Sequence, residues 1–324
     1  MSEAWRPYAE HNLIKLRAEV FAKIRQFMNE RNITEVETPI LSQATVSDVQ
    51  LNSFLTEYSS PQQSSAQVLY LQTSPEFAMK RLLASFSSSD GLGAIYQISK
   101  VFRNEEQGKL HNPEFTMLEW YQQGYDHHQL MKETESLLNL FAMSDCEKIS
   151  YGEVFAKHTG LNPHTCATDK LEDMAGEYGL SSSSGERSVL LDFIFSHKIA
   201  ATLGNTNPLF VYDYPTCQSA LAKLSDSSPK IAERFELFIN GMEIANGFHE
   251  LTDADEQLSR FEDDLNLRKK AKRSDVPIDH LFLDALRHGL PSCAGIAVGI
   301  DRLLMAITGI EDIREVITFP IERA

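Results

Sequence analysis

The sequence RFELFINGMEIANGFHE, residues 234–250, places an Asn-Gly pair at 240–241 between two apolar runs. An Asn-Gly pair in this setting is the strongest short-range signal for a β-hairpin with a two-residue turn. With this pair as the turn, Phe238 faces Glu243 across the hairpin. The stretch therefore predicts two antiparallel strands joined by a tight turn.

Two glutamates of this hairpin are expected on one face of the sheet. Glu236 lies two residues before Phe238, the predicted partner of Glu243, and side chains alternate between faces along a strand. The two carboxylates are then diagonal neighbours, roughly 7–8 Å apart. Like charges in apolar surroundings need a cation between them, and Mg²⁺ that bridges nucleotide phosphates takes one or two carboxylates. The alternative, two solvated carboxylates that are merely close, is disfavoured by the apolar neighbours.

Outward from the hairpin, the apolar pattern predicts a mixture of helices and strands. Helical spacing marks residues 10–30, 77–84, 127–141, 255–273 and 301–308. β-rich runs mark residues 33–41, 94–102 and 115–121, the last two as an antiparallel pair. Strands and helices do not alternate regularly, which favours an α+β fold with an antiparallel β-sheet flanked by helices.

Two arginines are candidates for binding phosphate. The sequence has no glycine-rich phosphate loop and no G-x-G-x-x-G, so a nucleotide site must be built in another way. Arg103 lies at the mouth of the loop between two predicted strands, and Arg302 opens an apolar helix after the small residues 295–299. The planar guanidinium suits phosphate. An ordinary surface arginine is the alternative for each alone, but two arginines and two carboxylates together fit MgATP.

Composition excludes several classes of protein. The 324 residues carry a formal net charge of -16, which argues against a protein held on nucleic acid by phosphate neutralisation. Four scattered cysteines, without a C-x-x-C pair, argue against a disulfide framework or a zinc site. We find no apolar run long enough for a membrane span and no signal-peptide core at the N-terminus. We expect a cytoplasmic protein with reduced thiols.

Three segments together resemble the motifs of class II aminoacyl-tRNA synthetases. Glu37-Thr38-Pro39 resembles motif 1, residues 102–119 resemble motif 2, and residues 299–302 resemble motif 3. Residues 111–119 and 243–247 look specifically like the lysyl branch. The resemblance covers nearly the whole chain. It implies the class II catalytic fold as a single domain over residues 1–324, a homodimer, and ATP and Mg²⁺ as cofactors.

The resemblance also implies a role for each motif residue. Arg103 would bind the α-phosphate and stabilise the transition state, and Arg302 would hold the γ-phosphate. Phe115 would stack on adenine, with Glu105 and His111 on ATP. Glu236 and Glu243 would hold Mg²⁺. The lysine-like substrate would be bound by Ser74, Glu76, Glu119, Tyr121, Asn246, Glu250 and Ala297.

Departures from the lysyl-tRNA synthetases narrow the resemblance. The motif 1 helix begins so early that we expect no N-terminal OB-fold for an anticodon. This truncated architecture resembles the elongation factor P lysyltransferases, which make a β-lysyl-adenylate and transfer the β-lysyl group to a lysine of elongation factor P. Ala297 and Ser74 stand where lysyl-tRNA synthetases usually have glycine and alanine. They would reshape the pocket for the displaced amine of β-lysine, and no stable tRNA binding is expected.

Three alternatives remain open at this point. A minimal lysyl-tRNA synthetase-like enzyme would charge tRNA, which the missing OB-fold and the net charge disfavour. A non-catalytic relative would usually lose the motif arginines, whereas Arg103 and Arg302 are present. An amide-forming relative like asparagine synthetase A is disfavoured by the lysyl-type carboxylates Glu119 and Glu250.

Overall fold

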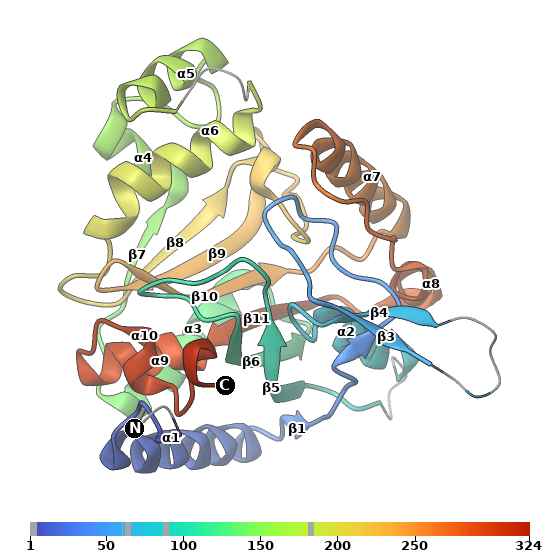
Figure 1. Cartoon of the computed structure of the whole chain (residues 1–324). Helices are drawn as coiled ribbons and strands as arrows, with labels where there is room; N and C mark the ends of the chain where they lie inside the picture. The colour runs from blue at the N-terminus through green and yellow to red at the C-terminus, as the bar shows by residue number, and fades with distance from the viewer. Residues whose placement is uncertain (1–4, 60, 62–65, 87–90, 181–184) are drawn as a thin grey trace. The chain divides into compact units, whose positions relative to one another are not determined.

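The computed structural model describes residues 5–59, 61, 66–86, 91–180 and 185–324. The chain forms two compact units, whose elements Figure 1 labels. The first comprises Met1–Gln123, Thr252–Ser292 and Ala297–Ala324, and the second comprises Gly124–Leu251 and Cys293–Ile296. The single catalytic domain over residues 1–324 stays a prediction.

The first unit contains a sheet in the order β1-β5-β6 and a smaller sheet in the order β2-β4-β3. Their strands are β1 (Thr34–Glu35), β2 (Leu41–Ser42), β3 (Leu55–Tyr58), β4 (Gln67–Leu71), β5 (Ile95–Phe102) and β6 (Glu114–Gln123). The helices are α1 (His11–Glu30), α2 (Glu76–Ser85), α7 (Ala254–Lys270), α8 (His280–Gly289), α9 (Ile300–Thr308) and α10 (Ile313–Val316), followed by the 3₁₀ turn Ile321–Arg323. The predicted antiparallel pair of strands is confirmed, because Ile95 pairs with Tyr121 and Phe102 with Glu114.

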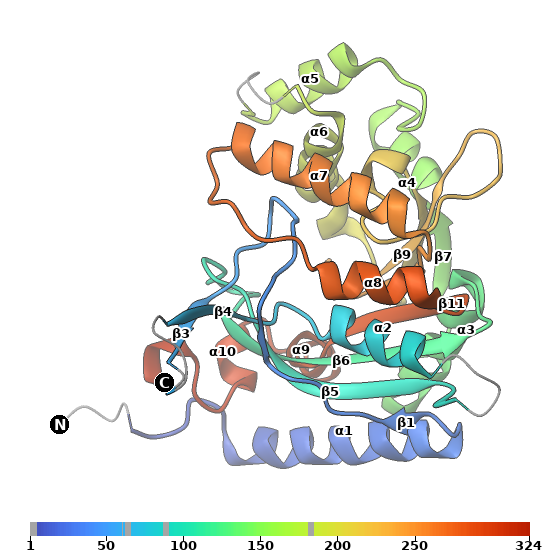
Figure 2. The ribbon, with the colours of Figure 1, turned by 90° about the vertical axis from the view of Figure 1, so that its right-hand side faces the viewer.

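Helix α1 follows its amphipathic pattern. The apolar side chains Val20, Ile24, Phe27 and Met28 are buried at helical spacing. Figure 2 shows α2 beside α8, where the rings of Phe77 and Phe282 stack with their centres 4.5 Å apart.

The strand predicted at residues 33–41 is wrong over most of its length. Only Thr34–Glu35 and Leu41–Ser42 are strands, and they belong to different sheets. Val36 still donates its N–H to the carbonyl of Tyr96, 2.8 Å away. Pro39 then interrupts the segment, since it has no N–H for a ladder.

The second unit contains the strand order β10-β9-β8-β7. Its strands are β7 (Glu147–Ser150), β8 (Leu209–Tyr214), β9 (Ala232–Ile239) and β10 (Met242–His249). Its helices are α3 (His127–Leu138), α4 (Tyr151–Thr159), α5 (Thr168–Glu177) and α6 (Arg187–Ile194), with a π-helical turn at Phe195–Ile199 and 3₁₀ turns at Asn139–Phe141, Ala200–Thr202 and Thr216–Gln218. The contacts between β8, β9 and β10 are antiparallel. Strand β11 (Cys293–Gly299) contributes its first four residues to this unit and Ala297–Gly299 to the first.

An aromatic core supports β8 and β9 of the second unit. The ring of Tyr151 lies 4.7 Å from that of Tyr214 on β8 and 5.0 Å from that of Phe195. Phe195 in turn contacts Phe238 of β9, with ring centres 5.9 Å apart. Burial of these large side chains stabilises β8 and β9, and β9 is the first strand of the glutamate hairpin.

We predict that Gly204→Ala weakens the second unit much more than Gly160→Ala. Gly204 braces the hairpin turn, because its carbonyl accepts from Asn240, 2.8 Å away. Both glycines have positive φ, but a Cβ on Gly204 would lie 2.6 Å from the carbonyl carbon of Phe238, whereas a Cβ on Gly160 would meet nothing within 4 Å. Gly160→Ala should cost about 1–2 kcal/mol for the left-handed backbone alone, and Gly204→Ala a further 1–3 kcal/mol or so for the overlap. Urea unfolding of the two variants measures the difference, and equal losses would contradict the packing argument.

We predict a pH-dependent gain in stability from Asp264→Asn. Burial raises the pKa of Asp264 on α7 to about 6, and the Ser47 hydroxyl that donates to it at 2.7 Å only partly opposes this effect. A carboxylate whose pKa is raised on folding destabilises the native state above that pKa, and the penalty fades as pH falls toward the unfolded value near 3.8. Since the group is partly solvated, the gain should be about 1–2 kcal/mol at pH 8 and small at pH 4.

The matched control for this variant is Asp263→Asn, on the exposed side of the same helix. It should change stability by less than about 0.5 kcal/mol. Urea unfolding from pH 4 to pH 8 gives both curves. A gain from Asp264→Asn that does not vary with pH would show that the ionised carboxylate carries no such cost.

Candidate active site

The first unit brings Arg103 and Phe115 together. Arg103 follows the end of β5, and its N–H donates to the carbonyl of Pro113 at 2.9 Å. Its guanidinium carbon lies 5.2 Å from the ring centre of Phe115 on β6. The Nε–H of Arg103 is buried and has no hydrogen-bond partner among the described residues. A buried donor without an acceptor is costly, so this site is suited to an anionic ligand.

Glu105 is held at the start of the same loop. Its carboxylate accepts from Arg273 at 2.9 Å and from the side chain of Asn52 at 2.8 Å. Its backbone has φ of 68°, which is uncommon for a residue with a side chain. Asn104 next to it donates its N–H to the carbonyl of Asn52, 2.7 Å away. These bonds fix the course of the loop. The role of Glu105 in binding ATP stays a prediction.

His111 and Arg302, both predicted to contact ATP, also lie together. Nη2 of Arg302 lies 2.7 Å from Nε2 of His111, and Nε donates to the carbonyl of Leu110 at 3.2 Å. Since a guanidinium only donates, Nε2 of His111 must accept, which leaves its proton on Nδ1. Arg302 stands in the first turn of α9. Its guanidinium is therefore held in one orientation by a backbone carbonyl and an imidazole.

Asp301 is a structural partner of this arrangement that the sequence reasoning missed. The side chain is buried, and its carboxylate receives the guanidinium of Arg17 and the N–H of Thr116, the latter at 2.7 Å. Arg17 also donates to the carbonyl of Val316 at 2.8 Å. One carboxylate thus joins α1, β6 and α9. The sequence feature that could have indicated this role is an acidic residue next to Arg302 in an otherwise apolar helix.

Strand β6 carries the predicted pair Glu119 and Tyr121. The two residues share a face of the strand, and the Tyr121 hydroxyl donates to Glu119 Oε1 at 2.6 Å. Both are buried. A buried carboxylate oriented by a phenol is a suitable acceptor for an ammonium group.

The remaining predicted residues of the first unit are Ser74, Glu76 and Ala297. Ser74 and Ala297 are half-buried, and Ala297 lies on β11. Glu76 begins α2 and accepts from the ammonium of buried Lys80 at 2.5 Å. Because Lys80 already balances the charge of Glu76, a substrate amine at this carboxylate would have to share it.

The hairpin of the second unit has the predicted register at its turn. Glu243 pairs with Phe238, so Glu236 and Glu243 share a face, as expected. A β-bulge between Glu243 and Ala245 then shifts the register by one residue. As a result Asn246, not Ala245, stands opposite Glu236. The bulge gathers two carboxylates and an amide on one face, which strict alternation along β10 does not predict.

Charge is concentrated on this face. Burial raises the pKa of Glu236 to about 7, Arg234 opposes that rise, and Glu243 adds to it. Arg234 forms an ion pair with Glu236 Oε1. A buried carboxylate next to a second one is electrostatically suited to a divalent cation. Glu250 is also buried, and its N–H donates to the carbonyl of Cys293 at 2.9 Å.

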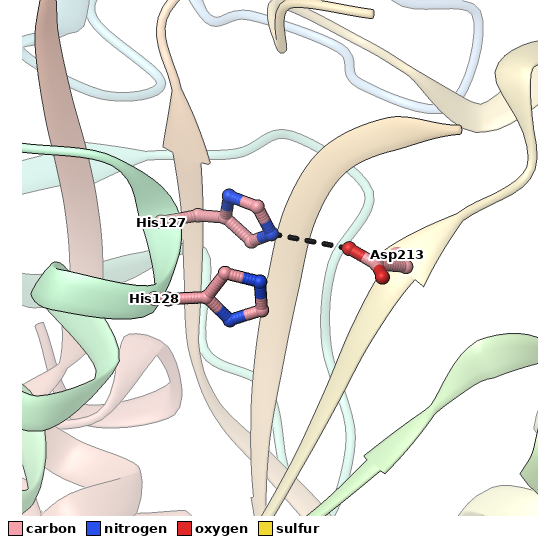
Figure 3. A group of neighbouring side chains, drawn as sticks. All are labelled: His127, His128 and Asp213. Atoms are coloured by element: carbon pink, nitrogen blue, oxygen red, sulfur yellow. Dashed lines mark hydrogen bonds and ion pairs between the residues drawn. The ribbon is translucent and has the colours of Figure 1, made fainter. Parts of the chain in front are cut away.

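A second group, His127, His128 and Asp213, offers donor atoms typical of metal ligands (Figure 3). Nε2 of His127 lies 3.1 Å from Asp213 Oδ1, while its buried Nδ1 has no hydrogen-bond partner among the described residues. The proton is best placed on Nε2, where Asp213 accepts it. A metal on Nε2 would move the proton to Nδ1, a buried position without an acceptor. We therefore assign this group to anchoring the start of α3 to β8.

Comparison with known proteins identifies the family of this chain. The sequence model of the class II tRNA synthetases (D, K and N) matches residues 4–323. The chain belongs to this family. The resemblance drawn from the three motifs is therefore confirmed, as is the α+β fold with a mainly antiparallel sheet flanked by helices.

Curated relatives match from end to end. The chain is 47% identical to "Elongation factor P--(R)-beta-lysine ligase" of Vibrio atlanticus (strain LGP32) over 328 residues, with 100% of each protein covered. It is 46% identical to the protein of that name from Vibrio cholerae, covering 99% of the chain and 98% of the relative. The corresponding protein of Yersinia enterocolitica is 45% identical, with 100% of both covered. Among the described residues, no helix has the length and apolar character needed to span a membrane.

We predict that Asp301→Asn destabilises the first unit by about 3 kcal/mol, because it leaves the partly buried Arg17 without a counter-charge. The control is Asp284→Asn, which removes the partner of Arg287 from an exposed pair 3.0 Å apart on α8. That change should cost less than about 1 kcal/mol. Urea unfolding compares the two. Similar small losses would mean that Asp301 is not the anchor described above.

Proposed function

We propose that this chain activates (R)-β-lysine with ATP as β-lysyl-adenylate and transfers the β-lysyl group to the ε-amine of a specific lysine of elongation factor P. The observation that carries the proposal is the end-to-end match to relatives of that name at 45–47% identity. The paired site residues support the first step, because the anion-binding arginines and the ammonium-binding carboxylates are all present.

ATP would be bound by residues of both motif loops in the first unit. Arg103, whose buried Nε lacks a partner among the described residues, would take the α-phosphate, with adenine on Phe115 beside it. Arg302, aimed by His111, would take the γ-phosphate. Glu105 would contact ATP from the neighbouring loop. Glu236 and Glu243 would hold Mg²⁺, which when bound supplies positive charge to the phosphates.

Chemistry then needs positioning and charge stabilisation, without a covalent enzyme intermediate. A carboxylate oxygen of β-lysine attacks the α-phosphorus in line, and pyrophosphate leaves. Arg103 would stabilise the charge that develops on the α-phosphate oxygens. The ε-nitrogen of the acceptor lysine next attacks the acyl carbon of the adenylate, loses a proton, and AMP leaves. Both steps depend on holding the reactants at reacting distance.

The amino acid would be recognised at its two ends. Glu119, Tyr121 and Glu250 would bind the side-chain ammonium, and Asn246 would bind the carboxylate. Glu76 would meet the second amine, and Ser74 and Ala297 would shape the pocket around it. The methyl group of Ala297 and the hydroxyl of Ser74 would favour an amine set one carbon further from the carboxylate.

The proposal also covers the location, the oligomeric state and the acceptor of the enzyme. We propose a cytoplasmic homodimer that acts on elongation factor P and binds no tRNA stably. A minimal lysyl-tRNA synthetase-like enzyme that charges tRNA is the second candidate. The names of the relatives favour the protein acceptor.

Activation is tested by ATP–pyrophosphate exchange with (R)-β-lysine and α-lysine, followed by mass spectrometry of elongation factor P and assay of tRNA. We expect faster exchange with β-lysine and one added lysyl mass on elongation factor P. Arg302→Ala should lower exchange by about 100-fold or more, since a positioned charge on a developing transition state contributes on this scale. Label on tRNA with α-lysine would favour the second candidate, and no exchange would reject both.

We predict that Ala297→Gly relaxes the selection against α-lysine. Removing one methyl group alters a pocket contact by about 1–3 kcal/mol, so activation of α-lysine relative to β-lysine should rise about tenfold. The ratio of kcat/KM for the two amino acids is the measurement, with wild type as reference. An unchanged ratio would remove Ala297 from the description of the pocket.

A further inference from the structure

Arg234 is a partly buried cation on the same face as the glutamate hairpin residues, and the roles above do not use it. The side chain is 16% exposed, and its guanidinium carbon lies over the rings of Tyr214 and Phe248, 4.5 and 5.8 Å from their centres. Phe248 is its cross-strand partner on β10. A guanidinium that contacts two aromatic rings is restricted in its orientation.

The donors of Arg234 are divided among three acceptors. Nη1 donates to the carbonyl of Gln218 at 2.9 Å, and Nη2 pairs with Glu236 Oε1. These two contacts fix the plane of the guanidinium. The remaining direction, along Nε–H, leads to Asn246 Oδ1 at 3.2 Å.

This third contact decides which end of the Asn246 amide is presented to a ligand. A guanidinium can only donate, so the amide oxygen must face Arg234. The Nδ2 amino group is then the end directed elsewhere, and it has no acceptor among the described residues. An amino group donates to a carboxylate, whereas an amide oxygen in that place would repel it.

We propose that Arg234 is a positioning residue for the amino-acid substrate: it fixes the Asn246 amide with its amino group toward the substrate carboxylate. The proposal rests on the substrate role proposed for Asn246. It does not depend on the position of the substrate amine, because α-lysine and β-lysine share the carboxylate. The bulge in β10 is a condition for this contact, since it places Asn246 opposite Glu236 and within reach of Arg234.

Two substitutions separate the Nε donor from the positive charge. In Arg234→Gln the amide nitrogen takes the place of Nε, so the bond to Asn246 is retained and the charge is lost. In Arg234→Lys a methylene takes the place of Nε, so the charge is retained and the bond is lost. Arg287→Lys, in an exposed pair with Asp284, is the control for an arginine-to-lysine change.

The experiment measures binding of the amino acid by calorimetry without ATP, and KM for amino acid and ATP in pyrophosphate exchange. We expect Arg234→Lys to weaken amino-acid binding and raise its KM about tenfold or more, with KM for ATP within about twofold of wild type. Arg234→Gln should keep amino-acid binding within about threefold. Circular dichroism and thermal melting report whether each variant is folded.

The outcomes separate this proposal from the proposed function. If wild type activates neither lysine, the function has failed, and no variant is needed to show it. If wild type is active but Arg234→Lys binds the amino acid normally, the positioning role is overturned. Equal loss of amino-acid and ATP binding in both variants also overturns it, because that pattern is the one expected of a general structural role.

Discussion

Burial of charge is the constraint on which the candidate residues of each unit depend. Each unit places a carboxylate in a largely apolar setting and pairs it with an arginine: Asp301 with Arg17 in the first unit, and Glu236 with Arg234 in the second. A buried pair contributes little net stability compared with apolar residues of the same size, but removing one partner is severe. Such a carboxylate can also accept further hydrogen bonds, which fix the groups around it. The N–H of Thr116, which donates to the Asp301 carboxylate, is an example.

The same principle explains why the motif residues are already oriented. Arg302 is held by His111 and by the Leu110 carbonyl. The preceding residue, Asp301, anchors the same helix to β6 through the N–H of Thr116. Arg103 lies over the ring of Phe115 on β6. The same strand is held by Asp301, which accepts the N–H of Thr116. A reaction that proceeds by positioning gains from such preorganisation, because the groups do not have to be reoriented as charge develops.

Local signals in the sequence predicted much of this structure. The Asn-Gly turn gave the correct pairing of Phe238 with Glu243, and periodicity gave α1, α2, α3, α7 and α9 close to their observed bounds. The motifs also singled out four residues that the structure places in two contacts, Arg103 with Phe115 and His111 with Arg302. These features depend on residues near one another in the chain or on a pattern shared with a family.

What the sequence did not predict depends on distant partners. The bond between Arg17 and Asp301 spans 284 positions, and neither residue alone indicates the other. The bulge in β10 is likewise not visible in the alternation of side chains, which alone would put Ala245 opposite Glu236, where Asn246 stands. That one-residue shift has chemical consequences. It moves an amide, with both a donor and an acceptor, next to a cation that can only donate, and the choice of which end of Asn246 remains for a ligand follows from it.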